Sequence, residues 1–378
     1  MDEVVIKKCS DYNLDEIKIK IEQGFELLGG ISKYIKKGEK VLLKPNSLSP
    51  SPVDSAVTTH PVFLRAVIQV IKKQTDRIFV GDSPSVGSYS SASKKTGMLP
   101  VIKEEGVQIV EFRDETYEIF STEKLAYRSF KIDPVIKEMD KIINLPRIKT
   151  HSLMVMTMCV KNMFGLIPGM RKVEFHLKAG HDKMLFAKML VDLNTARPPD
   201  LNILDGIIGM EGNGPGADGD PVNIGVILMG KNSFAVDTAA ATLVGVDPYS
   251  IYTNDVYRKY MLKRNDIEYY IKGDRIEGVL KKIRVPDTDV KSNAPVFLFN
   301  FAKDMITTKP VYLKEKCTGC LICVKHCPVS ALRYEGKKKG IICDYNKCIR
   351  CFVCHEVCPE RAITIKKPLL AFIFKGRK

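Results

Sequence analysis

The sequence lacks an apolar run long enough to cross a lipid bilayer, and its first residues, MDEVVIKKCSDYN, do not have the pattern of a secretion signal. We therefore expect a cytoplasmic protein without integral membrane contact. The apolar patch PLLAFIF at 368–374 is too short to span a membrane. It predicts a strand or tail packed on the core, with attachment to a membrane surface as the alternative.

Cysteine is nearly absent before residue 317, where the chain contains only Cys9 and Cys159. The other nine of the eleven cysteines lie between Cys317 and Cys358. Such clustering, in a chain without a secretion signal, favours metal ligation over a disulfide framework.

No nucleic-acid recognition motif accompanies the net charge of +15, so the sequence predicts no nucleic-acid partner. Much of the charge is local, because residues 311–378 contain fifteen Lys or Arg against five Asp or Glu. Basic neighbours offset the negative charge of thiolate-bound clusters, raise their reduction potential and attract acidic proteins. We therefore expect a redox protein of the ferredoxin or flavodoxin type as electron donor or acceptor.

Two copies of one cysteine motif, CTGCLICVKHCP at 317–328 and CIRCFVCHEVCP at 348–359, share the spacing C-x2-C-x2-C-x3-C-P. This spacing is typical of bacterial ferredoxins with two clusters, in which the fourth cysteine ligates the other cluster. Zinc fits poorly, since it takes four ligands that commonly come as two separated pairs. The sequence therefore predicts two 4Fe–4S clusters, one ligated by Cys317, Cys320, Cys323 and Cys358 and the other by Cys348, Cys351, Cys354 and Cys327.

Three side chains close to these motifs are not expected to be ligands. Cys343 fits neither set and is predicted to be a small core residue, with an alternative ligand or a redox thiol as the other possibilities. His326 and His355 are predicted to lie at the surface and to tune the clusters.

Strands and helices alternate through the first part of the chain, which predicts an α/β domain with a mostly parallel sheet and flanking helices. The segment 60–73 predicts a helix, with Thr59 as its cap and Pro61 in its first turn. With the strands before and after it, this helix predicts a βαβ unit, so those two strands should be parallel. The expected strands are 39–46, 77–84, 106–112, 141–146, 201–206 and 223–230, and further helices are expected near 180–195 and at 234–245.

The domain organisation is predicted from composition and from residues that commonly end helices and strands. Pro, Asp and Ser residues between 290 and 312 predict a linker. The charged, Tyr-rich region 250–285 predicts exposed helices. We expect an α/β domain at 1–305, a small α+β domain of the two-cluster ferredoxin type at 306–370 and a basic tail at 371–378.

Polar residues follow the ends of four predicted strands. Because ligands bind outside the carboxyl ends of strands in open parallel sheets, we expect these residues to line one crevice. Two long loops, 46–59 and the Gly-rich 209–220, point to the same edge. A phosphate cradle is one interpretation of the second loop, and a substrate loop or plain turns are the others, since neither the P-loop nor the dinucleotide fingerprint is present.

The stretch 147–165 is apolar and rich in methionine, with polar residues at both ends. It predicts a buried element that delivers its polar ends to a site, or a core element with snorkelling lysines. Cys159 within it is expected to be buried core. His176 and His181 are candidates for proton transfer or metal binding, with surface or supporting roles as the alternative.

The stretches LLKPN, TTHPVFLRAV, VGDSP, INLPRIKTH, VKNMFGLIPG, LNILDGIIGMEGNGP and AVDTAAATLVG resemble the prokaryotic domain-of-unknown-function family numbered 362, over about residues 39–247. Members often carry a C-terminal two-cluster ferredoxin module. The resemblance supports ten site residues without assigning roles to them: Lys44, Asn46, His60, Asp82, Lys149, His151, Lys161, Asn162, Asp205 and Glu211.

The combined evidence predicts an iron–sulfur reductase that acts on an anionic small molecule, in an anaerobic organism. We expect catalytic roles for Asp82, Lys149, His151, Lys161, Asn162, His176 and Asp205, and substrate-binding roles for Lys44, Asn46, His60, Ser83, Glu211 and Asn213. An additional cofactor or metal in the α/β domain is also considered. The alternatives are an electron carrier or assembly partner that docks another oxidoreductase, and a non-redox enzyme whose clusters are a sensor or structural element.

Overall fold

The computed structural model describes residues 1–378 except 114, 170, 181, 287–307 and 367–378. His181, the apolar patch 368–374 and the basic tail 371–378 therefore lie outside the described residues. The predicted domain boundary between 305 and 306 lies outside them as well, so the domain limits stay predictions.

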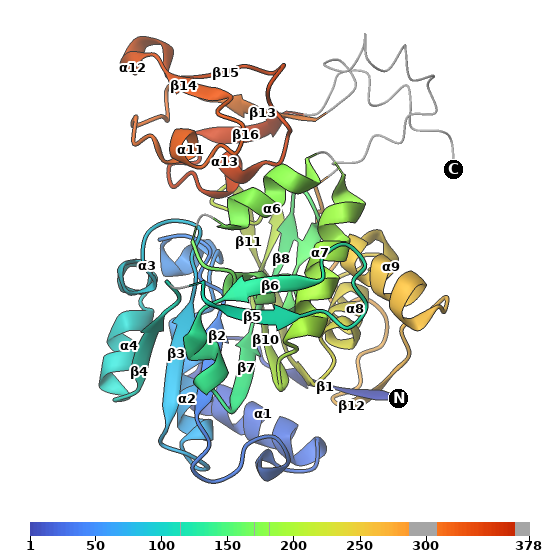
Figure 1. Ribbon diagram of the computed structural model, residues 1–378. Coiled ribbons are helices and arrows are strands. Elements are labelled where there is room, and N and C mark those ends of the chain that lie inside the picture. The colour runs from blue at the N-terminus through green and yellow to red at the C-terminus, as the bar shows by residue number, and fades with distance from the viewer. Residues whose placement is uncertain (114, 170, 181, 287–307, 367–378) are drawn as a thin grey trace.

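A ten-stranded sheet forms the centre of the large domain (Figure 1). Its strands are β1 (Asp2–Lys8), β2 (Val41–Pro45), β3 (Ile78–Asp82), β4 (Gln108–Glu111), β7 (Lys141–Leu145), β8 (Arg147–His151), β9 (Val155–Thr157), β10 (Leu201–Gly212), β11 (Gly219–Gly230) and β12 (Tyr269–Gly273). The order is β12-β1-β11-β10-β7-β2-β3-β4, and β8 pairs with β10 and β9 beside this path.

Most neighbouring strands are parallel. β2 pairs in parallel with β3 and β7, β3 with β4, and β10 with β7. β11 is antiparallel to both β1 and β10. The predicted α/β class and the parallel βαβ unit are confirmed.

Helices cover both faces of the sheet. They are α1 (Leu14–Leu27), α2 (Pro61–Ile71), α3 (Tyr89–Lys95), α4 (Met98–Glu104), α5 (Cys159–Asn162), α6 (Arg171–Ala179), α7 (Lys183–Ala196), α8 (Ser233–Leu243) and α9 (Tyr252–Val256). Because side chains alternate along a strand, Val41 and Leu43 pack with α1 and α2, while Leu42 packs with α7 and α8. The sheet is thus buried on both sides, as a parallel sheet requires.

Two local predictions differ from the structure. The cap of α2 is His60, whose Nδ1 accepts a hydrogen bond from Val62 N, and not Thr59. Thr59 instead accepts from Asn46 N and donates to the carbonyl of Leu145, which closes the loop 46–59 against β7. The region 250–285 is helical only in α9 and in a π-helical turn (Tyr257–Leu262), and β12 follows as an edge strand.

The Gly-rich segment 209–220 is mostly strand. β10 continues past Asp205 to Gly212, with a shift of register between Gly206 and Ile208. β11 begins at Gly219, so the two form a long antiparallel hairpin. Only residues 213–218 remain as a turn, which we call the hairpin tip. The glycines allow close strand contacts, since a Cβ at Gly209 would lie 2.9 Å from the carbonyl oxygen of Ile148.

The C-terminal module has a small α+β arrangement. β13 (Lys309–Tyr312) pairs with β16 (Ile363–Lys366), and β14 (Leu332–Tyr334) pairs with β15 (Ile341–Cys343). Its short helices are α11 (Ile322–Lys325), α12 (Gly336–Lys339) and α13 (Val353–Glu356). Figure 1 shows the module, in orange and red, above one end of the large sheet with α11 and α13 nearest to it.

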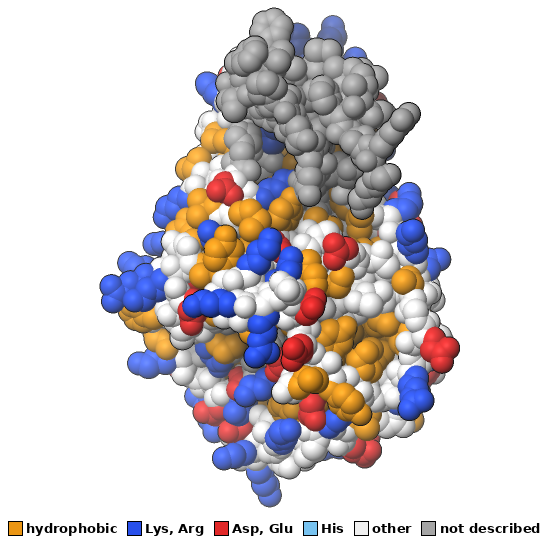
Figure 2. Space-filling model, turned by 90° about the vertical axis from the view of Figure 1, so that its right-hand side faces the viewer, with side chains coloured by type: hydrophobic (Ala, Val, Ile, Leu, Met, Phe, Trp, Pro, Cys, Tyr) orange, Lys and Arg blue, Asp and Glu red, His pale blue; other side chains and the backbone are white. Residues whose placement is uncertain are grey.

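The remaining described strands, β5 (Tyr117–Phe120) and β6 (Ser129–Ile132), form a hairpin beside α7. On the face of the molecule in Figure 2, basic and acidic side chains are intermixed with apolar ones. Among the described helices, none is both long enough and apolar enough to cross a membrane.

Candidate functional site

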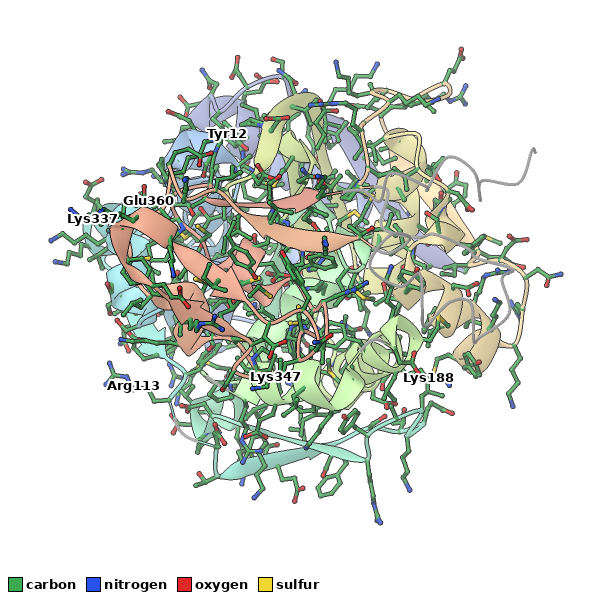
Figure 3. All side chains as sticks on the ribbon, turned by 90° about the horizontal axis from the view of Figure 1, so that it is seen from above. Tyr12, Arg113, Lys188, Lys337, Lys347 and Glu360 are labelled. Atoms are coloured by element: carbon green, nitrogen blue, oxygen red, sulfur yellow. The ribbon has the colours of Figure 1, made fainter. Side chains whose placement is uncertain are left out.

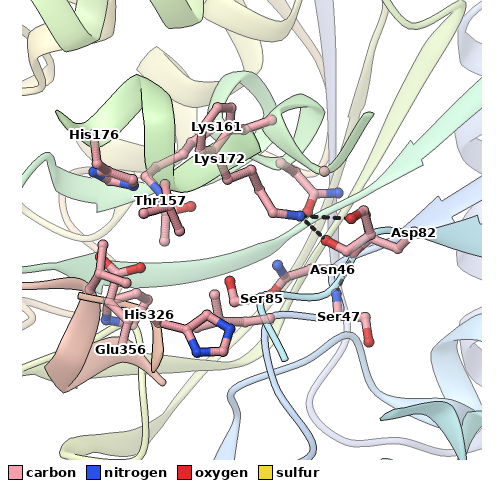
Figure 4. A pocket seen from close by; sticks show the side chains of 18 of the residues that line it. Asn46, Ser47, Asp82, Ser85, Thr157, Lys161, Lys172, His176, His326 and Glu356 are labelled. Carbon is pink, nitrogen blue, oxygen red and sulfur yellow. Dashed lines mark hydrogen bonds between the residues drawn. The ribbon is translucent and has the colours of Figure 1, made fainter. Parts of the chain in front are cut away.

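A pocket of about 720 Å³, partly open to solvent, lies between the carboxyl end of the sheet and the C-terminal module (Figure 4). Asn46 and Ser47 follow β2, and Asp82 and Ser83 come from the end of β3 and the residue after it. The rest of the wall comes from Leu48 and Ser85, from the segment 149–176, from Pro215 in the hairpin tip, and from His326, Val353 and Glu356 of the C-terminal module. The pocket therefore exists only where the two modules meet.

The base of the pocket is an ion pair. Lys44 and Asp82 are 0% and 4% exposed, and Lys44 Nζ lies 2.8 Å from Asp82 Oδ1. The other oxygen of Asp82 accepts a hydrogen bond from Ser47 N at 2.8 Å. Burial lowers the pKa of Lys44, and the nearby Asp82 carboxylate opposes this effect. Gly165 allows this arrangement, because a Cβ there would collide with the Asp82 carboxylate.

Three further lysines line the pocket, and they differ in how many hydrogen-bond acceptors their ammonium groups have. Lys149 Nζ donates to Asn46 Oδ1 at 2.6 Å and to the carbonyl of Val57 at 2.7 Å. Lys172 Nζ donates to the Ser83 carbonyl and hydroxyl oxygens at 2.5 and 2.8 Å, and more weakly to the carbonyls of Pro84 and Ile167. Among the described residues, we observe no hydrogen-bond acceptor for Lys161, whose ammonium lies 5.9 Å from the Phe164 ring centroid.

Burial also shifts the protonation of these lysines. It lowers the pKa of Lys172 to about 7 and the pKa of Lys161 below its ordinary value. For Lys149, burial and then the charges of Lys161 and Arg147 lower the pKa well below its ordinary value. An anion placed among these groups would favour their charged forms.

His151 and Glu356 face each other across the boundary between the modules. Their Nε2 and Oε1 atoms are 3.3 Å apart, at 0% and 6% side-chain exposure, without an aligned hydrogen bond. Nδ1 of His151 accepts from the backbone N–H groups of Leu153 and Met154. Since burial, Lys161 and His176 lower the pKa of His151 well below its ordinary value, the ring is neutral and its proton is on Nε2.

His176 forms part of the opposite wall. Its ring stacks on Phe186 at 4.4 Å between centroids and meets the edge of Phe164, and its Nδ1 has no hydrogen-bond partner among the described residues. Burial, followed by the charge of Lys161, lowers the pKa of His176 to about 3. The ring is therefore a neutral group with an unused polar atom in the pocket wall.

The eight motif cysteines surround two smaller cavities in the C-terminal module. One, of about 420 Å³, is lined by Cys317, Cys320, Cys323 and Cys358. The other, of about 310 Å³, is lined by Cys327, Cys348, Cys351 and Cys354. Each set combines three cysteines of one motif with the fourth of the other, as a pair of cubane clusters requires.

The backbone turns around each cavity at the same place in the two motifs. Leu321 and Phe352 have positive φ angles of 62° and 60° at matching places in the two motifs, which turns the chain around each cavity. Among the described residues, no three His, Cys, Asp or Glu side chains come close enough to hold one metal ion. The four thiols of each set line one cavity.

Seven of the predicted site residues line the pocket: Asn46, Asp82, Ser83, Lys149, Lys161, Asn162 and His176. Lys44 lies behind Asp82, and His151 lies behind Glu356. Asn162 donates to Asn144 Oδ1 at 2.8 Å and so ties the start of the 163–166 turn to the strand ends.

Four predicted site residues lie elsewhere. Asp205 accepts a hydrogen bond from Tyr12 at 2.9 Å and, more weakly, from the backbone N–H of His60, whose ring stacks on Tyr12. Glu211 accepts from Arg284 at the surface. Asn213 donates to Asp218 within the hairpin tip. The structure does not bring these four to the pocket.

Sequence reasoning missed Lys172 and Glu356. Lys172 lies in the first turn of the amphipathic helix α6, a position that suggests a surface lysine, and Glu356 lies between two predicted cluster ligands. The predicted surface position of His355 is wrong, because it is 1% exposed and its Nε2 lies 3.3 Å from Asp218 Oδ2. His326 lines the pocket.

The two remaining cysteine predictions fare differently. Cys159 is buried, as predicted, and burial together with Asp237 raises the pKa of its thiol. Cys343 is half-buried in β15, with its thiol beside Cys348 and Tyr312.

Comparison with known proteins agrees with this architecture. Residues 41–242 match the family model DUF362, a domain of unknown function. The chain belongs to this family. Residues 309–359 match a 4Fe–4S dicluster domain, so the C-terminal module carries iron–sulfur clusters and has a role in electron transfer.

Two individual proteins are similar to this chain. The thylakoid-associated protein of Synechocystis sp. is 35% identical over 250 residues, which are 66% of this chain and 77% of that protein. A crystal structure of a Thermotoga maritima protein aligns with a TM-score of 0.38 and 11% identity, over 61% of this chain and 58% of that one. This chain thus spans less than two thirds of the Thermotoga protein.

Proposed function

We propose that this protein is an iron–sulfur oxidoreductase whose pocket binds a small anionic substrate beside the clusters. The observation that carries the proposal is the shared wall of the pocket. Val353 and His326, which line it, directly precede the cluster ligands Cys354 and Cys327 in the sequence. A substrate in the pocket would therefore be separated from cluster ligands by very little protein.

The charge of the pocket supports an anionic substrate. Asp82 is already paired with Lys44, so Lys149, Lys161 and Lys172 face Glu356 as the remaining carboxylate in the lining. Lys161 is the lysine whose ammonium has no acceptor among the described residues, and it is the natural first contact for a carboxylate or phosphate. Charge-assisted hydrogen bonds of this kind are stronger than neutral ones.

Proton supply is a second requirement of most reductions. The fixed tautomer of His151 places an N–H group at the boundary between the modules, and His176 offers an unpartnered nitrogen on the other wall. Both rings are neutral because burial lowers their pKa values. We propose that they position the substrate and pass protons from solvent to it.

We propose that the two cysteine-lined cavities hold two 4Fe–4S clusters. Each bound cluster would supply one electron, so a two-electron reduction takes one electron from each, or two successive deliveries from outside. The substrate gains two electrons and two protons, and an external donor protein loses the electrons.

The test uses the intact protein purified without oxygen and reduced with limiting dithionite. A panel of small carboxylates and phosphate esters is added, and reoxidation of the clusters is followed by visible absorbance. We expect at least one anion to reoxidise them with saturation kinetics. In Lys161→Met, the KM for that anion should rise ~10-fold or more, since a charged contact is lost.

Lys188→Met is the matched control, because Lys188 is a partly buried lysine on α7 that packs over Tyr260 and lies outside the pocket lining. Its KM should stay unchanged. If no anion accelerates reoxidation, or if both variants behave alike, the proposed substrate site is wrong. Reoxidation that requires a second protein would instead favour an electron carrier.

A further inference from the structure

The two cysteine motifs are repeats of one another, but the fold exposes them unequally. Cys320 is exposed, whereas Cys351 at the matching place in the second motif is 8% exposed. The neighbouring Leu321 is 37% exposed, whereas Phe352 is 4% exposed. The backbone is alike at both places, with φ of 62° and 60°, so the difference comes from what covers each motif.

The second motif is turned toward the α/β domain. Val353 lines the substrate pocket, and Gly216 of the hairpin tip lies against the backbone of His355 and Glu356. His326 of the first motif also lines the pocket, but Cys320 and Leu321 of that motif are exposed to solvent. An electron that arrives from outside therefore meets the set Cys317, Cys320, Cys323 and Cys358 first.

The surface around this first set is basic. Lys314 and Glu360 line the mouth of its cavity, and Gly340 lies so close that its Cβ would be 3.2 Å from Lys314 Cβ. This contact places α12, with three exposed lysines, directly beside Lys314. Figure 3 shows Lys337 and Glu360 on the same side of the molecule, away from Lys347.

We define the docking face as Leu321 and Lys314, which are exposed and line the same cavity, together with the exposed lysines near Lys314: Lys316, Lys337, Lys338 and Lys339. The acidic side chains nearby are Glu315, Glu335 and Glu360, and Glu335 is paired with Arg333 and Lys339. The face thus combines an apolar centre with an excess of positive charge. Such a combination attracts an acidic surface and holds it by a small apolar contact.

We infer that the docking face binds a small acidic one-electron carrier protein and passes electrons through the first cysteine set to the second. The inference rests on the proposed function and adds its partner and the direction of the internal path. One electron leaves the carrier, which is oxidised, and one electron reduces the cluster held by the first set. No bond is formed or broken, and no further reactant is needed.

The experiment measures binding and electron exchange without any substrate. An acidic two-cluster ferredoxin and an acidic flavodoxin are the probes. Their affinity for the anaerobically purified chain is measured by titration calorimetry at about 0.02 M and about 0.3 M salt. Stopped-flow absorbance follows exchange from reduced probe to oxidised chain and from reduced chain to oxidised probe, so whichever direction is favourable is observed.

We expect at least one probe to bind, with an affinity that falls ~10-fold or more at the higher salt. The variant Lys337→Glu/Lys338→Glu should weaken binding and slow exchange by at least ~10-fold, with unchanged iron and sulfide content. The matched control Lys36→Glu/Lys37→Glu carries the same charge change at exposed positions far from the module, and it should match the unaltered chain. Leu321→Ser should weaken binding at both salt concentrations.

The inference is overturned if neither probe binds, or if the two double variants behave alike. It is also overturned if the Lys337→Glu/Lys338→Glu change abolishes binding to phosphatidylglycerol vesicles or to RNA and leaves carrier binding intact. Because no substrate is present, a failure here is separate from a failure of the substrate site. That site is tested independently by anion-driven reoxidation.

Discussion

At the scale of single residues, the pocket contains several lysines and histidines whose pKa values are lowered by burial. Lys149, Lys161, His151 and His176 all have pKa values below their ordinary range, and burial is the largest cause for each. Such shifts are typical of functional sites, although ion-pair networks also produce them. Here His151 Nε2 and His176 Nδ1 have no hydrogen-bond partner among the described residues, so an ion-pair network does not account for both histidines.

These shifts make stability depend on pH. An unfolded histidine takes up its proton near pH 6.5, whereas folded His176 does so at about 3. Between these values the unfolded chain binds the extra proton, so the free energy of unfolding falls as the pH falls, by up to about 1.4 kcal/mol per pH unit.

His176→Phe keeps a ring against Phe164 and Phe186 and removes this proton. Between about pH 7 and about pH 5, the free energy of unfolding of this variant should fall less steeply than that of the unaltered chain. The difference in slope should be at most about 1.4 kcal/mol per pH unit. His60 and His151 keep their own contributions, so some dependence remains. Urea unfolding at several pH values measures the effect. A slope equal to that of the unaltered chain would show that His176 is not held neutral by burial.

At the scale of elements, the long hairpin of β10 and β11 links the sheet to the cluster module. Its tip is tied to β8 by the N–H and hydroxyl of Ser152, which both donate to the carbonyl of Gly214. On the module side, Asp218 accepts from Thr364 at 3.2 Å and lies 3.3 Å from His355 Nε2. The hairpin tip therefore fixes the position of the module relative to the sheet.

A side chain at Gly216 should separate the two modules. A Cβ there would lie 2.9 Å from the carbonyl oxygen of Glu356 and 3.2 Å from its Cα, and backbone atoms cannot move aside cheaply. In Gly216→Val we expect faster hydrogen exchange of the α13 amides, with normal iron content. Asp220→Ala is the control, because Asp220 lies on the same hairpin and pairs with exposed Arg284 instead. Unchanged α13 exchange in Gly216→Val would contradict the role given to the tip.

At the scale of the whole molecule, a cluster-bearing module covers the carboxyl edge of an α/β domain and completes its pocket. The two sets of thiols each draw on both motifs, so neither motif forms a ligand set alone. Cys320 of the first set is exposed to solvent, whereas Cys327 and Cys354 of the second set directly follow residues that line the pocket. In the electron path that we propose, the first set is the outward end and the second set is the inward end.

The exchange of the fourth ligand between motifs can be tested with paired cysteine variants. Cys327→Ser/Cys351→Ser changes two cysteines of one cavity, so it should lose roughly half of the iron, no more than Cys351→Ser alone. Cys327→Ser/Cys320→Ser removes one cysteine from each cavity and should lose nearly all of the iron. Iron and sulfide analysis, with electron paramagnetic resonance of the reduced protein, gives the result. The reverse pattern would mean that each motif holds its own cluster.

Features that depend on residues close together in the sequence were predicted more successfully than features that depend on distant residues. The parallel βαβ unit follows from one apolar strand, one amphipathic helix and a second strand, all within a short stretch. The strands β1 and β12 escaped prediction for different reasons. β12 is an edge strand with weak apolar patterning, and it exposes Tyr270 and Ile271. β1 lies between β12 and β11, but its buried apolar run is only Val4, Val5 and Ile6, which is short for a strand signal. Asp205 was placed at a strand end because Gly206 suggested a stop, yet β10 continues, since the close approach of Val226 requires glycine there.

The sequence by itself determined the class of the fold, the grouping of the eight motif cysteines and most of the polar residues at the carboxyl edge. Each of these follows from spacing along the chain, which fixes the faces of strands and helices and the reach of the cysteine ligands. The tertiary structure alone decided that Glu356 faces His151, that Lys172 enters the pocket and that one motif is covered while its repeat is exposed. Those outcomes depend on how two distant modules pack against each other, and no local pattern encodes that contact.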